Sequence, residues 1–383
     1  MTRPAPPRVR FDRNELSGAF GDLGTDFPLI VGMILATDLD PAAVLIMFGA
    51  MQILTGLIYG IPMPAQPLKA MAVIVITQRV SGAVLAGGGL AIGIVMLALV
   101  ASGLIDALAR AIPKAVVRGI QFGLGLQLAA LALKDYLPAE GFQGYALGAL
   151  AFAIVVLLIG NRRFPPALFA IGLGLVYAFV WRLDVSALAG SVGLSVPHWS
   201  TPTWEHVWTG FLVLAIPQIP LSLGNSILAT QQIAQDLFPH KPLTVRRIGF
   251  TYSLMNLVNP FFGGVPTCHG SGGMAGHYAF GARTGGSVIV YGSMFLGIGL
   301  FLASGFDQVV HLFPKPVLGV ILLFEALTLI GLVRDTAPSK ADFSVVVLVG
   351  LCAVSLPYGY VVGMVAGALI AHLSKRNVIG LGR

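Results

Sequence analysis

Two short segments of the chain combine proline, glycine and small polar residues, a composition suited to binding an anion. They read PAQPLKAM over residues 64–71 and PTCHGSGG over residues 266–273. The apolar stretches to which they belong, 64–78 and 267–281, are shorter than the about 20 residues that a membrane helix needs. An extended stretch leading into a half-helix would present unpaired backbone N–H groups and roughly half a positive charge. The alternative is a glycine-rich turn packed between helices.

Lys69 is the single Lys, Arg, Asp or Glu between Pro41 and Gln78. A lysine near the centre of a bilayer costs about 2.5–3.5 kcal/mol on insertion scales and normally faces a partner or an aqueous path. A cation at the site would favour a negatively charged substrate. The alternative is that Lys69 lies near enough to the membrane surface for its ammonium group to reach water.

Two carboxyl groups near the N-terminus are candidates for carrying a coupling proton. Asp22 and Asp26 lie within GAFGDLGTDFP, residues 18–28, where two glycines and Pro28 could interrupt the helix close to the site. Asp22 could pair with Lys69 or take up the proton. Asp26 could equally be a helix-end residue near water.

A third candidate for the coupling proton lies in the second half of the chain. Glu325 is the lone charged residue between Lys315 and Arg334, which places it in the middle of an apolar span. It could carry a proton, or it could make a structural hydrogen bond to another helix.

Polar side chains recur at helical spacing within the apolar residues 208–234. They share one helix face, which lines either a substrate path or a contact between helices, and they are Gln218, Ser222, Asn225 and Ser226. Together with the two short segments, this stripe predicts a set of substrate-binding residues: Ala65, Gln66, Lys69, Ser222, Asn225, Thr267, Cys268, His269, Gly270, Ser271, Gly272 and Gly273. In that set, Thr267, His269 and Ser271 would add side-chain donors.

The composition indicates a protein embedded in lipid. Of the 383 residues, 56% are hydrophobic and 10% are charged, against roughly 25% charged in a soluble domain. The net charge of +7 is scattered between apolar spans, so it does not indicate a nucleic-acid partner. Cys268 and Cys352 stand far apart in apolar surroundings and indicate neither a disulfide framework nor a thiolate metal site.

Fourteen membrane elements are expected: twelve full spans and the two short segments. The spans are residues 16–36, 41–61, 82–104, 115–134, 143–160, 165–182, 208–234, 247–265, 285–304, 316–333, 341–356 and 357–374. Basic residues at both ends of the chain place both termini in the cytoplasm, which requires an even number of crossings. The count works only if both short segments cross as discontinuous elements buried within protein.

The two halves of the chain resemble one another at an offset of about 200 residues. Leu23-Gly24-Thr25 resembles Leu223-Gly224-Asn225, and the first short segment resembles the second. Seven crossings per half is an odd number, so the second copy must be inverted in the membrane. Short, interrupted segments at matching positions of an inverted repeat point to a transporter binding site near the bilayer midplane. The sequence therefore predicts an all-α polytopic membrane protein with a seven-plus-seven inverted repeat and two half-helices preceded by extended segments.

Four stretches of sequence carry a resemblance to a known family. They are residues 18–28 (GAFGDLGTDFP), 62–71 (PMPAQPLKAM), 223–229 (LGNSILA) and 259–285 (NPFFGGVPTCHGSGGMAGHYAFGARTG). Across essentially the whole chain, the sequence resembles the molybdate-transporter branch of the sulfate-permease superfamily. The resemblance implies a core domain that carries the site, a gate domain and an oxyanion substrate, and molybdate is implied by this likeness alone. Asp26 departs from it, since the likeness implies an apolar residue there.

The resemblance also implies a division of the chain into domains. The first four elements of each half would form the core and the last three the gate. The expected order is a cytoplasmic tail (1–15), core repeat 1 (16–104), gate repeat 1 (105–182), an external connection (183–207), core repeat 2 (208–304), gate repeat 2 (305–374) and a second cytoplasmic tail (375–383).

We expect a secondary active transporter that carries a tetrahedral oxyanion, molybdate or alternatively sulfate, by alternating access coupled to a proton or another ion. A nucleobase or carboxylate transporter of the same fold, or an anion-conducting channel, is the alternative. No catalytic or ATP-binding motif occurs, so we expect no enzyme, cofactor or metal site. The expected location is the plasma (inner) membrane. The expected surroundings are lipid, and no nucleic-acid partner is expected. Whether two copies form a homodimer is left open by the sequence.

Overall fold

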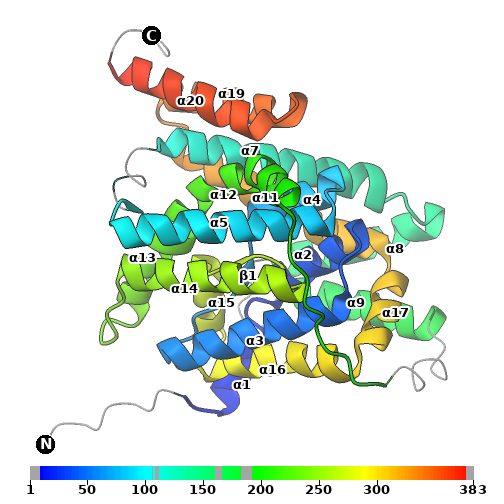
Figure 1. Ribbon diagram of the computed structural model, residues 1–383. Helices are drawn as coiled ribbons and strands as arrows, with labels where there is room; N and C mark the ends of the chain where they lie inside the picture. The colour runs from blue at the N-terminus through cyan, green and yellow to red at the C-terminus, as the bar shows by residue number, and fades with distance from the viewer. Residues whose placement is uncertain (1–8, 106, 108–111, 160–165, 183–191, 377–383) are drawn as a thin grey trace, which may run out of the picture.

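The computed structural model describes residues 9–105, 107, 112–159, 166–182 and 192–376, and most of them lie in helices. Figure 1 shows these helices as rods lying side by side, with β1 near the middle of the molecule. In this part of the chain, seven helical stretches are long and apolar enough to cross a bilayer, and shorter apolar helices accompany them. The fold is the all-α polytopic membrane fold that the sequence predicts. The expected tails and the connection at 183–207 lie partly outside the described residues.

Each half of the chain contains one short strand followed by a half-helix, set among longer helices. The first half comprises α1 (Arg13–Ala19), α2 (Leu23–Ala36), α3 (Pro41–Tyr59), β1 (Gln66–Pro67), α4 (Lys69–Gln78), α5 (Gly82–Ser102), α7 (Lys114–Leu131), η1 (Ala132–Tyr136), α8 (Gly141–Leu158) and α9 (Pro166–Trp181). The second half begins with one continuous helical stretch made of α11 (Trp204–Gly210), η2 (Phe211–Ala215), α12 (Ile216–Leu221), η3 (Ser222–Leu228) and α13 (Ala229–Leu237). It continues with α14 (Val245–Val258), η4 (Asn259–Phe262), β2 (Thr267–Cys268), α15 (Ser271–Ala279), α16 (Gly286–Phe301), α17 (Ala303–Leu312), α18 (Lys315–Gly331), η5 (Leu332–Thr336), α19 (Lys340–Ser355) and α20 (Gly359–Lys375).

The first predicted span is interrupted, because α1 ends at Ala19 and α2 begins at Leu23. Gly21 lies in the break, where its backbone presses against that of Gly276; a Cβ on Gly21 would lie 2.5 Å from the carbonyl carbon of Gly276. Pro28 lies inside α2, and the helix continues past it. The close approach of two glycines, and not the proline, therefore marks the interruption.

α17 is a helix that the sequence pattern does not predict. Its ten residues follow α16 directly and precede the turn into α18. The segment is too short to count as a span and mixes polar with apolar residues, so a rule based on apolar length assigns it to a connection.

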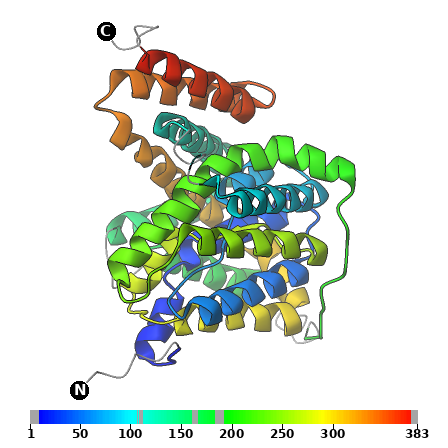
Figure 2. The same ribbon diagram turned by 60° about the vertical axis from the view of Figure 1, so that its left-hand side comes forward.

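Two sets of helices take their names from the core and gate domains that the resemblance implies. In the core bundle, which comprises α1–α5 and α11–α16, α3 packs along α16, and α5 packs against α11 and α14. In the gate bundle, which comprises α7–α9 and α18–α20, α7 packs against α18, α19 and α20, and α8 packs against α9 and α18. Figures 1 and 2 both show α7, α19 and α20 along one side of the molecule and α3 with α16 along the opposite side.

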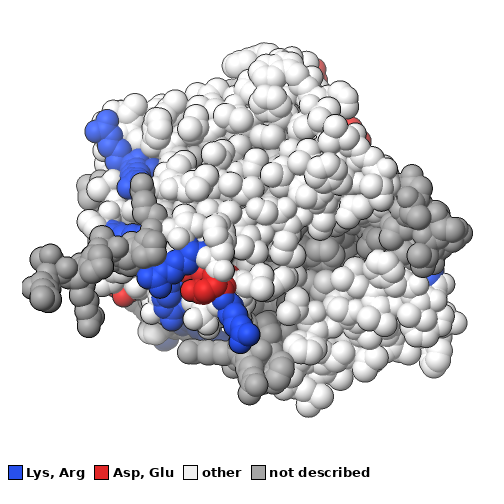
Figure 3. All heavy atoms as spheres, turned by 90° about the horizontal axis from the view of Figure 1, so that it is seen from below, with Lys and Arg blue, Asp and Glu red and all other residues white. Residues whose placement is uncertain are grey.

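The surface of the molecule is suited to lipid. Figure 3 shows a face on which most side chains are neither basic nor acidic, while most of the visible Lys and Arg side chains gather toward one end of it. Many large apolar side chains are exposed, among them Phe142, Leu157 and Trp204, each more than three-quarters accessible. Apolar exposure on this scale indicates contact with a bilayer, and the chain is an integral membrane protein.

The two halves of the chain meet at the centre through their short strands. β1 and β2 pair antiparallel, with Gln66 opposite Cys268 and Pro67 opposite Thr267. The amide of Leu68 then donates to the carbonyl of Pro266 at 2.9 Å. Each strand leads directly into a half-helix, α4 or α15, so the predicted extended segments and half-helices are confirmed and their N-terminal ends lie close together.

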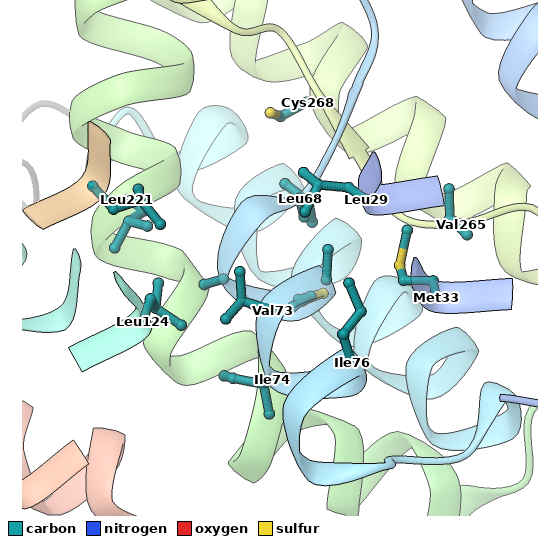
Figure 4. Close-up of a cluster of buried hydrophobic side chains, with 14 of the residues drawn as sticks. Leu29, Met33, Leu68, Val73, Ile74, Ile76, Leu124, Leu221, Val265 and Cys268 are labelled. Carbon is teal, nitrogen blue, oxygen red and sulfur yellow. The ribbon is translucent and has the colours of Figure 1, made fainter. Parts of the chain in front are cut away.

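α4 is apolar on all sides and is enclosed by other helices. Figure 4 shows Leu68 and Val73 among side chains from α2, α7 and α12, including Leu29, Leu124 and Leu221. Every residue from 70 to 76 is buried. A helix that is hydrophobic all round must be buried in protein or lipid. This enclosure holds the N-terminus of α4 at a set position in the centre of the molecule.

Two amide side chains hold the extended segments in matching ways. The Gln52 side chain on α3 donates to the carbonyl of Ala65 at 2.9 Å and accepts from the Ala65 amide at 3.0 Å. The Asn256 side chain on α14 donates to the carbonyl of Thr267 at 2.7 Å and accepts from the Thr267 amide at 3.0 Å. Since buried backbone groups must be paired, these two amide clamps replace the hydrogen bonds that a helix would have supplied.

We expect Gln52→Leu or Asn256→Leu to destabilise the protein by about 1–3 kcal/mol, because each leaves a buried N–H and a buried carbonyl unpaired. The measurement is the thermal unfolding of purified protein in detergent. Gln232→Leu is the matched control, because that amide is exposed on α13 and bonds only Asp236. Equal stability of the clamp variants and the control would contradict this role.

Candidate functional site

A cavity of about 200 Å³ lies where the N-terminal ends of α4 and α15 face the gate bundle. Its walls come from both half-helices, from α12 and η3, and from α7, α18 and η5 of the gate. The lining residues are Gln66, Lys69, Gln121, Gln218, Leu221, Asn225, Ser226, Cys268, Ser271, Gly272, Thr328, Leu329 and Leu332. At roughly 30 Å³ per water molecule, the cavity has room for a small ion and part of its hydration shell.

Lys69, the first residue of α4, supplies the positive charge of the cavity. Its ammonium group donates to Oε1 of Glu325 at 2.8 Å, and the two side chains are 25% and 14% exposed. Glu325 lies on α18, so the ion pair joins the core bundle to the gate bundle. Lys69 therefore faces a charged partner at the centre of the molecule and does not reach the membrane surface.

The carboxylate of Asp22 lies at the break between α1 and α2 and faces β1. Both of its oxygens accept from Nε2 of Gln66, each at 2.7 Å. Asp22 is therefore paired with Gln66, while Lys69 is paired with Glu325. One consequence is that the Gln66 amide is held in a fixed orientation beside the cavity.

The N-termini of the two half-helices differ in what binds them. On α4, the amides of Ala70 and Met71 donate to Oε1 of Gln218 at 2.9 and 3.3 Å, so a side chain of α12 occupies this end. On α15, no acceptor in the described part of the chain contacts the backbone N–H groups of the first three residues, 271–273. An anion in the cavity would therefore find unpaired amides at α15 and a charged side chain at α4.

Two further groups border the open end of α15. The hydroxyl of Ser271 donates to Oδ1 of Asn225 at 3.1 Å, and both residues line the cavity. Gly272 is exposed, and a Cβ built on it would meet no atom within 4 Å. The backbone at Gly272 is thus directly accessible from the cavity.

The structure brings together half of the predicted substrate-binding residues. Those that line the cavity are Gln66, Lys69, Asn225, Cys268, Ser271 and Gly272. The other six, Ala65, Ser222, Thr267, His269, Gly270 and Gly273, lie behind it and are buried. Their positions indicate that they support the residues that line the cavity.

His269 and Thr267 show what these buried residues do. His269 bonds the carbonyl of Pro64 through Nδ1 at 3.0 Å and the hydroxyl of Thr251 through Nε2 at 2.7 Å, so neither ring nitrogen is available to a ligand. Thr267 is held by the amide clamp of Asn256. His269 connects the first extended segment to α14 through its side chain, and Thr267 connects the second extended segment to α14 through its backbone.

Close contacts explain three more of them. A Cβ on Gly270 would lie 1.3 Å from Oε1 of Gln66, and one on Gly273 would lie 2.3 Å from Oδ2 of Asp22. The hydroxyl of Ser222 bonds the side chain of Gln218 at 3.1 Å and that of Tyr252 at 2.7 Å. The two glycines allow the Gln66–Asp22 pair to lie against α15. Ser222 orients the side chain of Gln218, which accepts from the backbone N–H groups at the start of α4.

Asp26 lies in the first turn of α2, so it is a helix-end residue, but it is buried in protein and not near water. It is fully buried on α2, and its Oδ2 accepts from the hydroxyl of Tyr291 on α16 at 3.3 Å. Its other oxygen has no partner among the described residues. A buried carboxyl oxygen without a partner is costly, so Asp26 remains a candidate for holding a proton.

Several lining residues were not among the predicted binding set. Gln218 and Ser226 belong to the polar stripe, which carried the signal for them, whereas Gln121 and Thr328 lie on the gate helices α7 and α18. For Gln121 and Thr328, the signal available in the sequence was a polar side chain within an otherwise apolar gate span. Nothing in the sequence shows which gate residues face the half-helices.

Comparisons with known proteins agree with this architecture. A sequence model of the family described as "Molybdate transporter of MFS superfamily" matches residues 14–128 and 210–329. A protein of Arabidopsis thaliana named Molybdate transporter 1 is 33% identical over an alignment of 401 residues, gaps included. The alignment covers 93% of this chain and 87% of that protein. Molybdate transporter 2 of the same plant is 34% identical over 406 residues, with the same two coverages. A protein of Chlamydomonas reinhardtii named Molybdate transporter 1 is 27% identical over 481 residues, covering 94% and 91%.

Solved structures share the fold. The transmembrane domain of a cyanobacterium bicarbonate transporter, BicA, superposes with a TM-score of 0.65 at 15% identity, covering 95% of this chain and 98% of that one. Murine Slc26a9, an anion transporter in the inward-facing state, gives 0.68 at 14% identity, covering 97% and 70%. The fold is that of these transporters, whereas MFS transporters are built from two six-helix halves. By its sequence, the chain belongs to the molybdate transporter family.

Proposed function

We propose that this chain carries a tetrahedral oxyanion, molybdate in the first place and sulfate as the alternative, across the membrane as a secondary transporter. The observation that carries the proposal is the cavity between the half-helices, where Lys69 faces the unpaired amides at the start of α15. An ammonium group and backbone N–H groups are all hydrogen-bond donors. A dianion with four oxygens can accept from all of them at once.

The relatives support the choice of molybdate. Their names describe molybdate transporters, and the similarity extends over most of each chain. Molybdate and sulfate share charge and shape, so selection between them would depend on the size of the cavity and on the spacing of its donors. The same donors would bind an uncharged nucleobase less well, because a neutral ligand lacks the charge attraction between Lys69 and a dianion.

Transport would proceed by movement of the core against the gate. The packing of the helices supports the boundaries expected from the sequence, since the cavity lies between the two bundles and is lined by both. We propose that both termini lie in the cytoplasm, which agrees with the gathering of Lys and Arg toward one end of the face in Figure 3. A proton is the coupling ion that the buried carboxyl groups favour.

Calorimetric titration of the purified protein with molybdate, tungstate, sulfate and uracil tests this proposal. We expect saturable binding of molybdate and tungstate with similar affinity, weaker binding of sulfate and no binding of uracil. The matching experiment is uptake of molybdate into proteoliposomes, which should saturate and be inhibited by tungstate. Binding of uracil in place of the oxyanions, or unsaturable anion currents, would contradict the proposal.

A further inference from the structure

Glu325 lies between two cavities. Its carboxylate binds Lys69 beside the anion cavity and also lines a second cavity of about 290 Å³. Phe20, Gly21, Gly24 and Thr25, from the break between α1 and α2, form one wall of this second cavity, and α8 and α9 form the other. Thr328, one turn after Glu325 on α18, lines both cavities. The Lys69–Glu325 pair therefore separates the two spaces.

The charges around this pair do not balance. Lys69 is the one ammonium group in electrostatic contact with three carboxyl groups, those of Glu325, Asp22 and Asp26, among the described residues. Three carboxylates against one ammonium would leave two uncompensated negative charges inside the membrane. Such charges are expensive in a bilayer, and a dianion entering the cavity would add two more.

Among the residues that the structure describes, the other elements that pack against α18 place no compensating charge near Glu325. α8 and α9 present Val155, Ile159 and Leu168 to the second cavity. Tyr136 of η1 lies against Gly319, toward the start of α18, and Asp335 of η5 is bound by Lys114 and Arg118 of α7 beyond its end. Within the described part of the chain, the charged groups around the ion pair are therefore those of Lys69, Asp22, Asp26 and Glu325 itself.

We propose that Glu325 is a proton-binding site whose protonation releases Lys69 to the anion, so that one proton enters with each dianion. A proton from water in the second cavity binds the carboxylate, and the ion pair between Lys69 Nζ and Glu325 Oε1 is lost. The same ammonium then donates to an oxygen of the anion. This inference rests on the proposed function, because it requires an anion in the cavity. Glu325 acts through Lys69 and is a positioning residue.

The competing explanation is that the pair is a structural link between the bundles. A structural link would be weakened by Glu325→Gln, and anion binding would weaken or stay the same at every pH. A proton-controlled link predicts a different pattern, because glutamine imitates the protonated acid: it is neutral and nearly the same shape. Lys69 would then be available to the anion at every pH.

The test is calorimetric titration of the purified full-length chain with molybdate at a series of pH values, in buffers of different ionisation enthalpy. For the natural protein we expect affinity for molybdate to fall as the pH rises, with about one proton taken up per anion. For Glu325→Gln we expect tight binding that does not depend on pH and takes up no proton. Glu140→Gln is the matched control, because Glu140 is also a gate carboxylate in an ion pair, with Arg182, and lies outside both cavities.

The possible results distinguish the role of Glu325 from the proposed function. Loss of molybdate binding in Glu325→Gln, or a natural protein that binds molybdate with no pH dependence and no proton uptake, would overturn the role of Glu325 and leave the proposed function standing. The same pH dependence in Glu325→Gln as in the natural protein would overturn it as well. Failure of the natural protein to bind molybdate at any pH would overturn the proposed function itself.

Discussion

Lys69→Ala is expected to abolish molybdate binding and uptake. Lys69 is the charged donor of the cavity, and truncating one partner of a buried, hydrogen-bonded charge pair costs about 2–5 kcal/mol, which is a loss of roughly 30-fold or more in affinity. The measurements are calorimetric titration with molybdate and initial uptake rates in proteoliposomes. Uptake at the natural rate by this variant would contradict the location of the site.

Removing Lys69 alone also leaves Glu325 as an unpaired charge, so loss of binding has to be separated from loss of the fold. The double variant Lys69→Met with Glu325→Gln removes both charges together and is expected to fold and still fail to bind. Lys114→Ala is the matched control, because Lys114 is likewise the first residue of a helix and pairs with a carboxylate, Asp335, at 2.8 Å. Its side chain is 63% exposed, away from the cavity, so binding should be unchanged.

Gly272→Leu is expected to reduce uptake to the background level while the protein remains folded. A Cβ at Gly272 meets no neighbouring atom, so a leucine side chain can be accommodated, and the space that it enters is the anion cavity. It would cover the unpaired amides at the start of α15 and fill much of the 200 Å³ volume. The measurements are molybdate binding by calorimetry and thermal unfolding of the same sample.

Gly297→Leu is the control for this substitution. Gly297 lies in the middle of α16, and its Cβ would also meet no atom within 4 Å, but it lines neither of the two cavities around Lys69. Both variants exchange the same two residue types within a helix, so any general effect of the change on stability is shared. Normal uptake by Gly272→Leu, or equal loss by both variants, would place the anion elsewhere.

Most of the fold is predictable from the sequence, because apolar length and charge placement are local signals. The two short segments are the informative case: their length excludes ordinary spans, and their proline and glycine content indicates an extended stretch before each half-helix. The pairing of Gln66 with Cys268 agrees with the offset of about 200 residues between the repeats. α17 escapes prediction because its ten residues are too few to cross a bilayer, so a rule based on apolar length assigns them to a connection.

The site is less predictable, since the partners of its residues are distant in sequence. The sequence singles out Lys69 and Glu325 as lone charges, yet nothing local indicates that they bind one another. The assignment of Gln218 as the cap of α4 likewise depends on how α12 crosses the half-helix. For His269 the sequence predicts a role that the structure does not give it. A histidine can donate to an anion, but here both ring nitrogens bond protein groups, the carbonyl of Pro64 and the hydroxyl of Thr251.

The amide clamps could have been recognised from the repeat. Gln52 and Asn256 are amides at equivalent places in α3 and α14, each a short distance before an extended segment. An amide side chain carries a donor and an acceptor side by side, so it can donate to the carbonyl and accept from the N–H of the same residue. A pair of amides at repeat-related positions is therefore a signal for clamped backbone.

The separation of Lys69 from Glu325 along the chain affects how the protein is made. The two residues are 256 positions apart, so at about 5–20 residues per second the ribosome adds Glu325 roughly 13–50 s after Lys69. During that interval the newborn first repeat holds an ammonium group whose ion-pair partner, Glu325, does not yet exist, and at first a strand, β1, whose partner strand β2 does not yet exist. Neither can stay in hydrocarbon unpaired. The burial of α4 must therefore follow the synthesis of α18, and the first half of the molecule completes its insertion only when the second half arrives.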